Sequence, residues 1–575
     1  VELQVKLEKT FGFKLPVAKL IVGPTIEELA DFILQELTKP EISSTIKASA
    51  EPEYGTFPLS KGQEAMWVQH QMAPKSIFNP VYAVRVRSSV DLDRLHEVLK
   101  TIVKRHASLR TTFHFKGGEQ IQRVHEYMDV HFDVRDVSQH NDTGVQQQID
   151  DLAGQTYDLT KGPLFRTTVL QRSAKDFVLV IAAHHIVMDM WSLAVIVNEL
   201  SQLYLNTDKD FSFLPMQYRY TDYVAWQNHM LKGPQGDEML AYWTKKLSGH
   251  LPVLELPTDF ARPAVQKFDG KISSIKLGAD LTDKLKQISD ERGVTLYMTL
   301  LAAFKVLLHK YTGQDDVIVG TPTTGRSQSE FTDIVGYFVN PVALRSFVNR
   351  KESFTSFLSQ VQKTVVDALA NQDYPFYQLV EKLAPSRDPS RTPVFQTMFV
   401  YQRAHVLNDE GLSSASLGIE GDEMTFAGLP VSVLPIQDQV SPFDMTWMAA
   451  EAKDGLGLSL TYNTSLYEET TILRLLDQYK TLLESITEKP EQTISQLQVV
   501  PYSELYQVLF GWNDTHVPLP DNPCIQEEFA AQVKKRPNAV AVHYEGEELT
   551  YAQLDAKANQ LGHFLQQRGV GNETV

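Results

Sequence analysis

The sequence predicts a mixed α/β (α+β) protein in which helices alternate with strands from about residue 57 to residue 490. Residues 177–183 are continuously apolar, as expected of a strand that is covered on both faces. From Trp191 to Tyr204 apolar residues recur near helical spacing, which predicts a helix soon after the strand. Two histidines and an aspartate lie between them, at the kind of junction where side chains leave a packed core.

Length, charge and cysteine content limit the class of protein. The chain has 575 residues, which predicts three or four folding units or one large two-lobed domain with additions. Its 71 acidic and 54 basic residues give a net charge of -17, which argues against nucleic acid or an anionic membrane as a partner. Cys524 is the single cysteine, so neither a disulfide framework nor a sulfur-based zinc site is expected.

Signals for export or membrane insertion are not found in the sequence. No apolar run approaches the roughly 20 residues that span a bilayer, and residues 1–6 do not resemble a signal peptide. We therefore expect a cytoplasmic protein. The chain starts at Val1 inside a helical pattern, so we expect a fragment of a larger protein.

Residues 1–40 predict a small helical unit. Thr25 and Glu28 form a capping box at the start of its second helix. Two such short helices cannot hold a core alone, so we expect the rest of the unit upstream. Residues 41–56 are rich in Ser, Thr, Pro and Glu and predict a linker.

The next segment predicts a helix followed by a hairpin. Asp91 can cap a helix that ends near Arg105, with its apolar residues on one face. Residues 110–115 and 120–125 then alternate like paired strands joined by a Gly-Gly turn.

A second long helix can start at Thr295 and lead to a strand at residues 317–320. A weak repeat relates residues 90–95 to residues 279–285, and each follows a strand-like stretch. The repeat is consistent with two related lobes. However, Asp before an apolar helical stripe is also the pattern of an ordinary helix N-cap.

Residues 491–522 predict a second linker because they contain Pro, Thr and Ser at close intervals. A new domain starts at residue 523 with an amphipathic segment, a strand-turn-strand at residues 540–549 and a helix after Thr550. Residues 523–575 are too few to complete that domain.

The polar cluster at the strand end has three possible interpretations. His184, His185 and Asp189 have the side chains of a non-haem iron site, but adjacent strand residues point to opposite faces and cannot easily share one ion. Alternatively, one histidine faces a substrate channel and acts as a proton or hydrogen-bond acceptor, while the other is structural. In the third interpretation both are core histidines whose hydrogen bonds are formed within the protein.

Other segments contribute candidate residues. Arg110 leads an alternating strand, so we expect it to point inward and to need an anion such as Asp189. Residues 220–226 read most simply as an aromatic packing segment. Residues 335–341 combine Gly, Asn and Pro, as either a bent strand along a cavity or a plain turn would.

Several common catalytic motifs are not found in the sequence. It contains no GxxxxGK[ST] phosphate loop, no GxSxG nucleophile elbow and no HExxH zinc motif. Acid-base or positional catalysis by a histidine is therefore the favoured enzymatic option.

The order of the motifs resembles the condensation domain of nonribosomal peptide synthetases across residues 57–490. The matching segments are residues 59–67 (LSKGQEAMW), 105–113 (RHASLRTTF), 184–191 (HHIVMDMW), 220–226 (YTDYVAW), 335–345 (VGYFVNPVALR), 371–376 (NQDYPF) and 387–395 (RDPSRTPVF). The resemblance implies a V-shaped pseudo-dimer of two chloramphenicol-acetyltransferase-like lobes, at residues 57–230 and 231–490, with an active-site tunnel between them.

The resemblance also implies roles for single residues. His185, the second histidine of the HHxxxD core, would be catalytic, and His184 would be structural. Asp189 would be structural and paired with an arginine, for which Arg110 is the first candidate and Arg345 the second. Trp226 and Asn340 match positions that shape the site in the family. The sequence departs from the family at Met190, where Gly is usual, so tunnel width is expected to differ there.

The flanks resemble neighbouring domains of the same assembly lines. Residues 1–40 look like the end of an acyl carrier protein of the polyketide type, and residues 523–575 resemble the start of an adenylation domain. The expected partners are therefore an upstream acyl carrier and a downstream peptidyl carrier, which bring acyl and aminoacyl thioesters on phosphopantetheine arms. ATP and Mg²⁺ would serve only the complete adenylation domain, and no metal is expected in the condensation domain.

The resemblance implies amide-bond formation between an upstream acyl chain, expected to be a polyketide, and the amine of a downstream aminoacyl thioester. An epimerisation domain and a non-catalytic recruitment domain share the fold and are the alternatives. An adenylation start directly after the domain speaks against epimerisation, and the intact His185 and Asp189 speak against mere recruitment. Heterocyclisation relatives carry Asp at the position of His184, so that activity is not expected.

Overall fold

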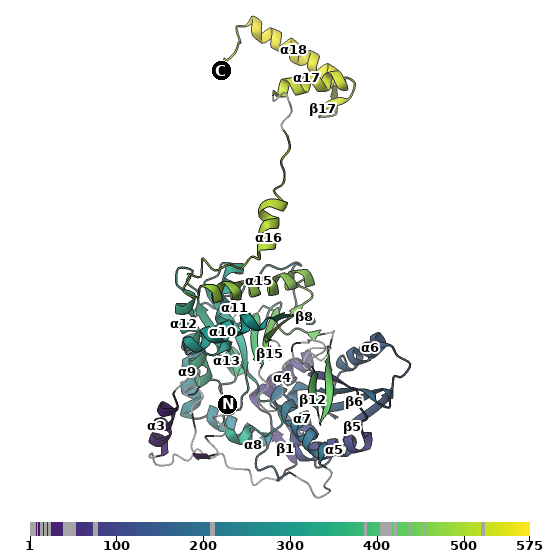
Figure 1. Ribbon diagram of the computed structural model, residues 1–575, viewed down its shortest axis with the longest axis vertical. Coiled ribbons are helices and arrows are strands. Elements are labelled where there is room, and N and C mark those ends of the chain that lie inside the picture. The colour runs from purple at the N-terminus through teal and green to yellow at the C-terminus, as the bar shows by residue number, and fades with distance from the viewer. Residues whose placement is uncertain are drawn as a thin grey trace. The chain divides into compact units, whose positions relative to one another are not determined.

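The computed structural model describes most of the chain and divides it into two units, residues 1–501 and residues 502–575 (Figure 1). The described residues are 7, 10, 11, 15, 20, 25–37, 53–72, 79–206, 213–383, 388–402, 417, 423–426, 428–436, 439–452, 455–518 and 524–574. Most of the predicted carrier segment and of the first linker lie outside the described residues, as do residues 519–522 of the second linker and Arg387.

The first lobe is built around a sheet of six described strands in the order β12-β13-β2-β7-β6-β5. Its central strand β7 is antiparallel to both neighbours, and its side chains from Phe177 to Ala183 are all buried, as the apolar run predicts. The strands are β2 (Val81–Val86), β5 (His131–Asp136), β6 (Phe165–Ser173), β7 (Asp176–Ala183), β12 (Glu423–Phe426) and β13 (Leu429–Leu434). The helices of this lobe are α4 (Lys61–Met72), α5 (Leu92–Arg105), α6 (Asp142–Ala153) and α7 (Met190–Leu205).

The predicted helix and hairpin of the first lobe are confirmed. Asp91 caps α5, because its side chain accepts a hydrogen bond of 3.0 Å from the backbone N–H of Arg94. The hairpin consists of β3 (Thr111–Lys116) and β4 (Glu119–Val124), and β1 (Gly55–Pro58) pairs with β4. Gly117 and Gly118 form its turn with φ angles of 63° and 89°, which glycine adopts without strain.

The second lobe contains a sheet of seven described strands in the order β10-β9-β11-β15-β16-β8-β14. The strands are β8 (Asp269–Leu277), β9 (Asp316–Thr323), β10 (Asn340–Phe347), β11 (Thr397–Gln402), β14 (Gln439–Val440), β15 (Met445–Ala452) and β16 (Gly455–Asn463). The accompanying helices are α8 (Tyr220–Leu231), α9 (Pro234–Lys246), α10 (Ala279–Glu291), α11 (Leu296–Thr312), α12 (Phe354–Ala370), α13 (Phe376–Leu383) and α15 (Glu469–Glu488).

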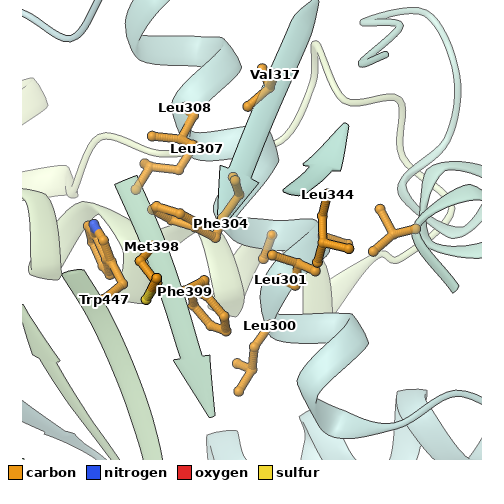
Figure 2. Packing of buried hydrophobic residues seen from close by; sticks show 14 of the residues in the cluster. Leu300, Leu301, Phe304, Leu307, Leu308, Val317, Leu344, Met398, Phe399 and Trp447 are labelled. Atoms are coloured by element: carbon orange, nitrogen blue, oxygen red, sulfur yellow. The ribbon is translucent and has the colours of Figure 1, made fainter. Parts of the chain in front are cut away.

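The core of the second lobe forms between its sheet and the central helix α11. Phe304 of α11 packs against Phe399 of β11 and Trp447 of β15, with ring centroids 5.3 and 5.0 Å away (Figure 2). Thr295 caps this helix as predicted, at 3.3 Å from the backbone N–H of Met298.

The two lobes are joined by more than a single connection. Strands β12 and β13 come from residues 423–434, inside the range predicted for the second lobe, yet β13 pairs with β2 of the first sheet, Val431 opposite Val86. Helix α13 also lies against α4 of the first lobe. The sheet of the first lobe therefore depends on residues far from 57–230.

The two ends of the chain contain short elements. Helix α3 (Ile26–Leu37) starts at the predicted capping box, with the Thr25 N–H donating to Glu28 at 2.8 Å. The described part of the unit of residues 502–575 contains α16 (Tyr502–Tyr506), η4 (Gln507–Gly511), α17 (Ile525–Lys535), β17 (Val540–Tyr544), β18 (Glu547–Thr550) and α18 (Tyr551–Gln567). Its predicted strand-turn-strand and the helix after Thr550 are confirmed.

No single helix in the described part of the chain is long and apolar enough to cross a membrane. Helices α10 and α11, bent by 105° at the break between them, reach that length and composition only as a pair.

One buried cation stands out in the second lobe. Lys305 of α11 is fully buried, and its Nζ donates to the Leu344 carbonyl at 2.6 Å and to the Ser346 hydroxyl at 2.8 Å. Burial, with a smaller contribution from the nearby charge of Lys246, lowers the pKa of Lys305 to about 7.

This pKa predicts how the stability of the unit depends on pH. Between pH 7 and 10.5 the unfolded state binds more protons at Lys305 than the folded state, so the free energy of unfolding rises with pH by at most about 1.4 kcal/mol per pH unit from this group. We expect Lys305→Met to remove this contribution. Chemical denaturation of both proteins at pH 7.5 and 9 measures it, and an identical change in the two proteins would contradict the prediction.

Candidate active site

The polar cluster lies at the predicted junction of a strand and a helix. Strand β7 ends at Ala183, a single 3-10 turn covers His185–Val187, and α7 begins at Met190. Asp189 caps α7, because its Oδ1 accepts the backbone N–H of Ser192 at 2.8 Å. The side chains of His184 and Asp189 thus each accept a hydrogen bond from a backbone N–H, and these two caps hold the backbone on either side of His185.

His185 is held in one tautomer. Its Nδ1 lies 2.6 Å from the Met188 carbonyl oxygen, which can only accept, so Nδ1 carries the proton. Burial lowers the pKa of His185, and the Asp189 carboxylate and the Met188 carbonyl offset this only in part. The ring is therefore neutral at pH 7 with a lone pair on Nε2. None of the described residues donates a hydrogen bond to Nε2, and Tyr337 contacts the ring edge-to-face at 5.2 Å.

His184 lies in a different environment. Its Nδ1 accepts the Ile186 N–H at 3.2 Å, so Nε2 carries the proton and donates to Nδ1 of His70 at 3.2 Å. Burial lowers the pKa of His184 to about 3, which keeps the ring neutral. Both nitrogens are thus used inside the protein, and His184 is not among the residues that line the adjoining cavity.

Asp189 forms a buried ion pair with Arg326. Both side chains are inaccessible to solvent, and Nη1 and Nη2 of Arg326 lie 2.7 and 3.1 Å from the two carboxylate oxygens. Ser192 and the Phe338 N–H, at 3.2 Å, complete the donors around the carboxylate. Burial alone would raise the pKa of Asp189, but the charge and hydrogen bonds of Arg326 outweigh it and lower the pKa.

The two predicted partners of Asp189 were therefore wrong. Arg110 lies in a 3-10 turn before β3 and not on the alternating strand, and it binds Glu53 and the His125 carbonyl instead. Arg345 is on β10, where it pairs with Asp316 of the neighbouring β9 at 2.7 Å. Arg326 follows β9 in the sequence, so a charged residue just after a buried strand was the signal that could have identified it.

The ion pair is connected to the segment of residues 335–341. The Ser192 hydroxyl lies 2.7 Å from Asp189 Oδ1 and accepts the Gly336 N–H at 3.0 Å. Gly336 is required here, since a Cβ atom would lie 2.1 Å from the ring of Tyr220. Residues of this segment line the cavity, which favours the cavity interpretation over a plain turn.

Trp226 and Asn340 support the site from outside the main cavity. Trp226 packs with Tyr223 and Phe331 in an aromatic cluster, as the sequence of residues 220–226 predicts. The Asn340 amide donates to the carbonyls of Gln372 and Tyr374 at 2.7 and 2.8 Å, and its oxygen accepts the Phe376 N–H at 2.9 Å. Gln372 and Phe376, which line the cavity, are thereby held in place.

A cavity of about 1700 Å³ adjoins His185 and is lined by residues of both lobes. Its wall is mostly apolar, with polar side chains at several positions along the lining. Typical small-molecule pockets measure about 300–1,000 Å³, so this cavity can hold more than one reactant. The arrangement combines a neutral imidazole acceptor, a large cavity and a buried ion pair that Asp189 forms four residues further along the chain.

The ion pair can be tested by a double-mutant cycle. Arg326→Ala leaves the Asp189 carboxylate buried and unpaired, so we expect a loss of about 3–5 kcal/mol in the free energy of unfolding. Asp189→Ala combined with Arg326→Ala should show a coupling energy of about 1–3 kcal/mol. Denaturant titration measures both. Arg110→Ala, combined with Asp189→Ala, is the matched control and should be additive; a coupling as large as that of Arg326 would contradict the assignment.

Comparison with known proteins agrees with this geometry. A family model for the condensation domain matches residues 53–509, and one for AMP-binding enzymes matches residues 529–575. Tyrocidine synthase 3 of Brevibacillus parabrevis is 38% identical over 99% of the chain, gramicidin S synthase 2 of Brevibacillus brevis is 34% identical over 98%, and bacitracin synthase 3 of Bacillus licheniformis is 32% identical over 100%. The chain spans only 8%, 12% and 9% of the length of these proteins.

Solved structures show the same fold. Holo-AB3403, a four-domain nonribosomal peptide synthetase, matches 91% of the chain and 40% of its own length with a TM-score of 0.79 at 22% identity. The condensation domain of the monacolin K polyketide synthase MokA matches 76% of the chain and 99% of its own length with a TM-score of 0.66 at 22% identity. The chain therefore belongs to the condensation-domain family of nonribosomal peptide synthetases, followed by the start of an AMP-binding domain.

Proposed function

We propose that this protein joins an acyl chain on an upstream carrier to the amino group of an aminoacyl thioester on a downstream carrier. The observation that carries the proposal is His185, whose Nδ1 proton is committed to the Met188 carbonyl while its ring lines a cavity shared by both lobes. A neutral imidazole with a free Nε2 can accept a proton or a hydrogen bond from an attacking amine.

The reaction needs an amine nucleophile and a thioester. An α-amino group titrates at about 8, so part of it is neutral near pH 7 and can attack the thioester carbonyl carbon. The C–N bond forms as the C–S bond breaks, the proton leaves the amine and the carrier thiol is released. His185 either takes that proton or orients the amine and stabilises the zwitterionic intermediate. Asp189 and Arg326 do not take part in this transfer and hold the loop that carries His185.

The thioesters would arrive on phosphopantetheine arms that belong to the partner carrier domains. The cavity of about 1700 Å³ has room for two such arms to meet at His185. ATP and Mg²⁺ are proposed to serve only the complete adenylation domain, of which residues 529–575 match the start. The cytoplasmic location stays a prediction.

The origin of the acyl chain is a separate proposal. Met190 and the resemblance of residues 1–40 to a polyketide-type carrier point to a polyketide chain, and the apolar cavity wall suits a hydrocarbon-rich donor. The relatives named above, which align with at least 98% of the chain, are synthases of tyrocidine, gramicidin S and bacitracin. Neither epimerisation nor recruitment is favoured by any feature of the site.

Replacement of His185 tests the proposed activity. We expect His185→Ala to lower the rate of amide formation between loaded carriers by a factor of about 10²–10⁴, the usual contribution of a positioned acid-base group. Mass spectrometry of the product in single-turnover reactions measures the rate. His140→Ala, at an exposed site away from the cavity, is the matched control. Transfer by His185→Ala at the wild-type rate would refute the proposal.

The pH dependence follows from the lowered pKa of His185. The imidazole accepts a proton only when neutral, and its pKa lies below the ordinary value of about 6.5, so activity should fall only below pH 6.5. The assay should use an amine substrate that is weakly basic and stays neutral above pH 5. The pH dependence then reports protonation of His185 and not ionisation of the substrate. Single-turnover rates from pH 5 to 8 should keep more than half their maximum at pH 6.5. A midpoint above 6.5 would contradict the lowered pKa.

A further inference from the structure

A tyrosine hydroxyl in the cavity wall has a weak hydrogen-bond partner. Tyr82 lies on β2 opposite Ile181 of β7, and both line the cavity that His185 lines. The phenol O–H of Tyr82 donates to the thioether sulfur of Met190 at 3.3 Å. Met190 is the first residue of α7 and directly follows Asp189.

A thioether sulfur is a poor substitute for an oxygen acceptor. Buried tyrosine hydroxyls usually find an oxygen or nitrogen partner, whereas the methionine sulfur accepts only weakly. Met190 also has a flexible, unbranched side chain that can move aside at low cost. A substrate oxygen that reached the Tyr82 hydroxyl would therefore replace the Met190 sulfur and would be the stronger hydrogen-bond acceptor.

The hydroxyl stays a donor at all physiological pH values. Burial raises the pKa of Tyr82, and the negative charge of Asp189 raises it further. Strands β2 and β7 and helix α7 also contribute apolar side chains to the cavity lining, so the Tyr82 hydroxyl is a polar group on a largely apolar part of the wall. These apolar side chains are Val84, Leu179, Ile181, Leu193, Ala194 and Val197.

We propose that Tyr82 is a specificity-determining residue that donates a hydrogen bond to an oxygen atom of the acyl chain, in exchange for the sulfur of Met190. This inference rests on the proposed function for the identity of the ligand as a carrier-bound acyl chain. It favours chains that contain a carbonyl oxygen in addition to the thioester over pure hydrocarbon chains. Such an oxygen occurs both in 3-oxoacyl chains and in the amide of a peptidyl chain.

The contribution of this contact is moderate, because the Tyr82 hydroxyl is not left unpaired when a hydrocarbon chain binds. A single neutral hydrogen bond changes affinity by roughly threefold to tenfold. A site whose buried donor had no alternative partner would discriminate far more strongly.

Binding of stable acyl-pantetheine amides to the full chain tests the proposal without any turnover. The probes are the amides of octanoic acid, of 3-oxo-octanoic acid and of an N-acetylated amino acid, measured by calorimetry. We expect the wild type to bind the 3-oxo probe about three to ten times more tightly than the octanoyl probe, and Tyr82→Phe to bring this ratio close to one. The affinity of the 3-oxo probe compared with that of the N-acetylaminoacyl probe shows whether the site prefers the oxygen of a polyketide-type chain or that of a peptidyl chain.

Two further variants serve as controls. Tyr242→Phe removes a phenol hydroxyl at a site outside the cavity lining and should keep the wild-type ratio. Met190→Leu removes the competing sulfur at similar volume and should keep or increase the ratio. An equal ratio in wild type and Tyr82→Phe, or an equal loss of affinity for all probes, would overturn the inference.

The same proteins separate this inference from the proposed function. If the wild type discriminates between the probes but forms no amide from loaded carriers, the proposed reaction fails and the binding role of Tyr82 stands. If it forms amides from the octanoyl and 3-oxo-octanoyl donors with ratios of kcat/KM that Tyr82→Phe does not change, the reaction stands and the specificity role fails.

Discussion

The arrangement of the site depends on the buried ion pair between Asp189 and Arg326. The carboxylate caps α7 of the first lobe, while the guanidinium comes from the segment after β9 of the second lobe. Removing two charges from water is costly, and hydrogen bonds from Ser192 and Phe338 to the carboxylate, and from Arg326 to the Ile334 carbonyl, help to offset that cost. Because the pair bridges the lobes, it fixes the position of His185 relative to the residues that the second lobe contributes to the cavity.

Features that depend on local sequence were predicted well. The apolar run of β7 and the caps Thr25, Asp91 and Thr295 all occur as predicted, since each depends on neighbours within a few residues. The junction that carries His185 was found for the same reason. His184 and His185 have different partners, as expected, but not because side chains alternate along a strand: β7 ends at Ala183, and His185 lies in a 3-10 turn.

Features that depend on distant contacts were not predicted. Arg326 lies 137 residues from Asp189, and its position just after the buried strand β9 marks it as a candidate site residue without indicating that Asp189 is its partner. Arg110 was misplaced because a 3-10 turn, and not a strand, contains it. The contact between Tyr82 and Met190 spans 108 residues and depends on how α7 packs against β2. Such pairings depend on the three-dimensional path of the chain, which a single sequence does not reveal.

The exchange of strands between the lobes has a consequence for how this protein can be divided. Strand β2 lies between β7 and β13, so a fragment that ended near residue 230 would lose β13 and expose the backbone N–H and C=O groups along one edge of β2. An open edge of this kind readily pairs with other chains and promotes aggregation. The two lobes thus share a sheet edge that the first lobe cannot close alone, and only a piece that reaches at least to Leu434 keeps that edge covered.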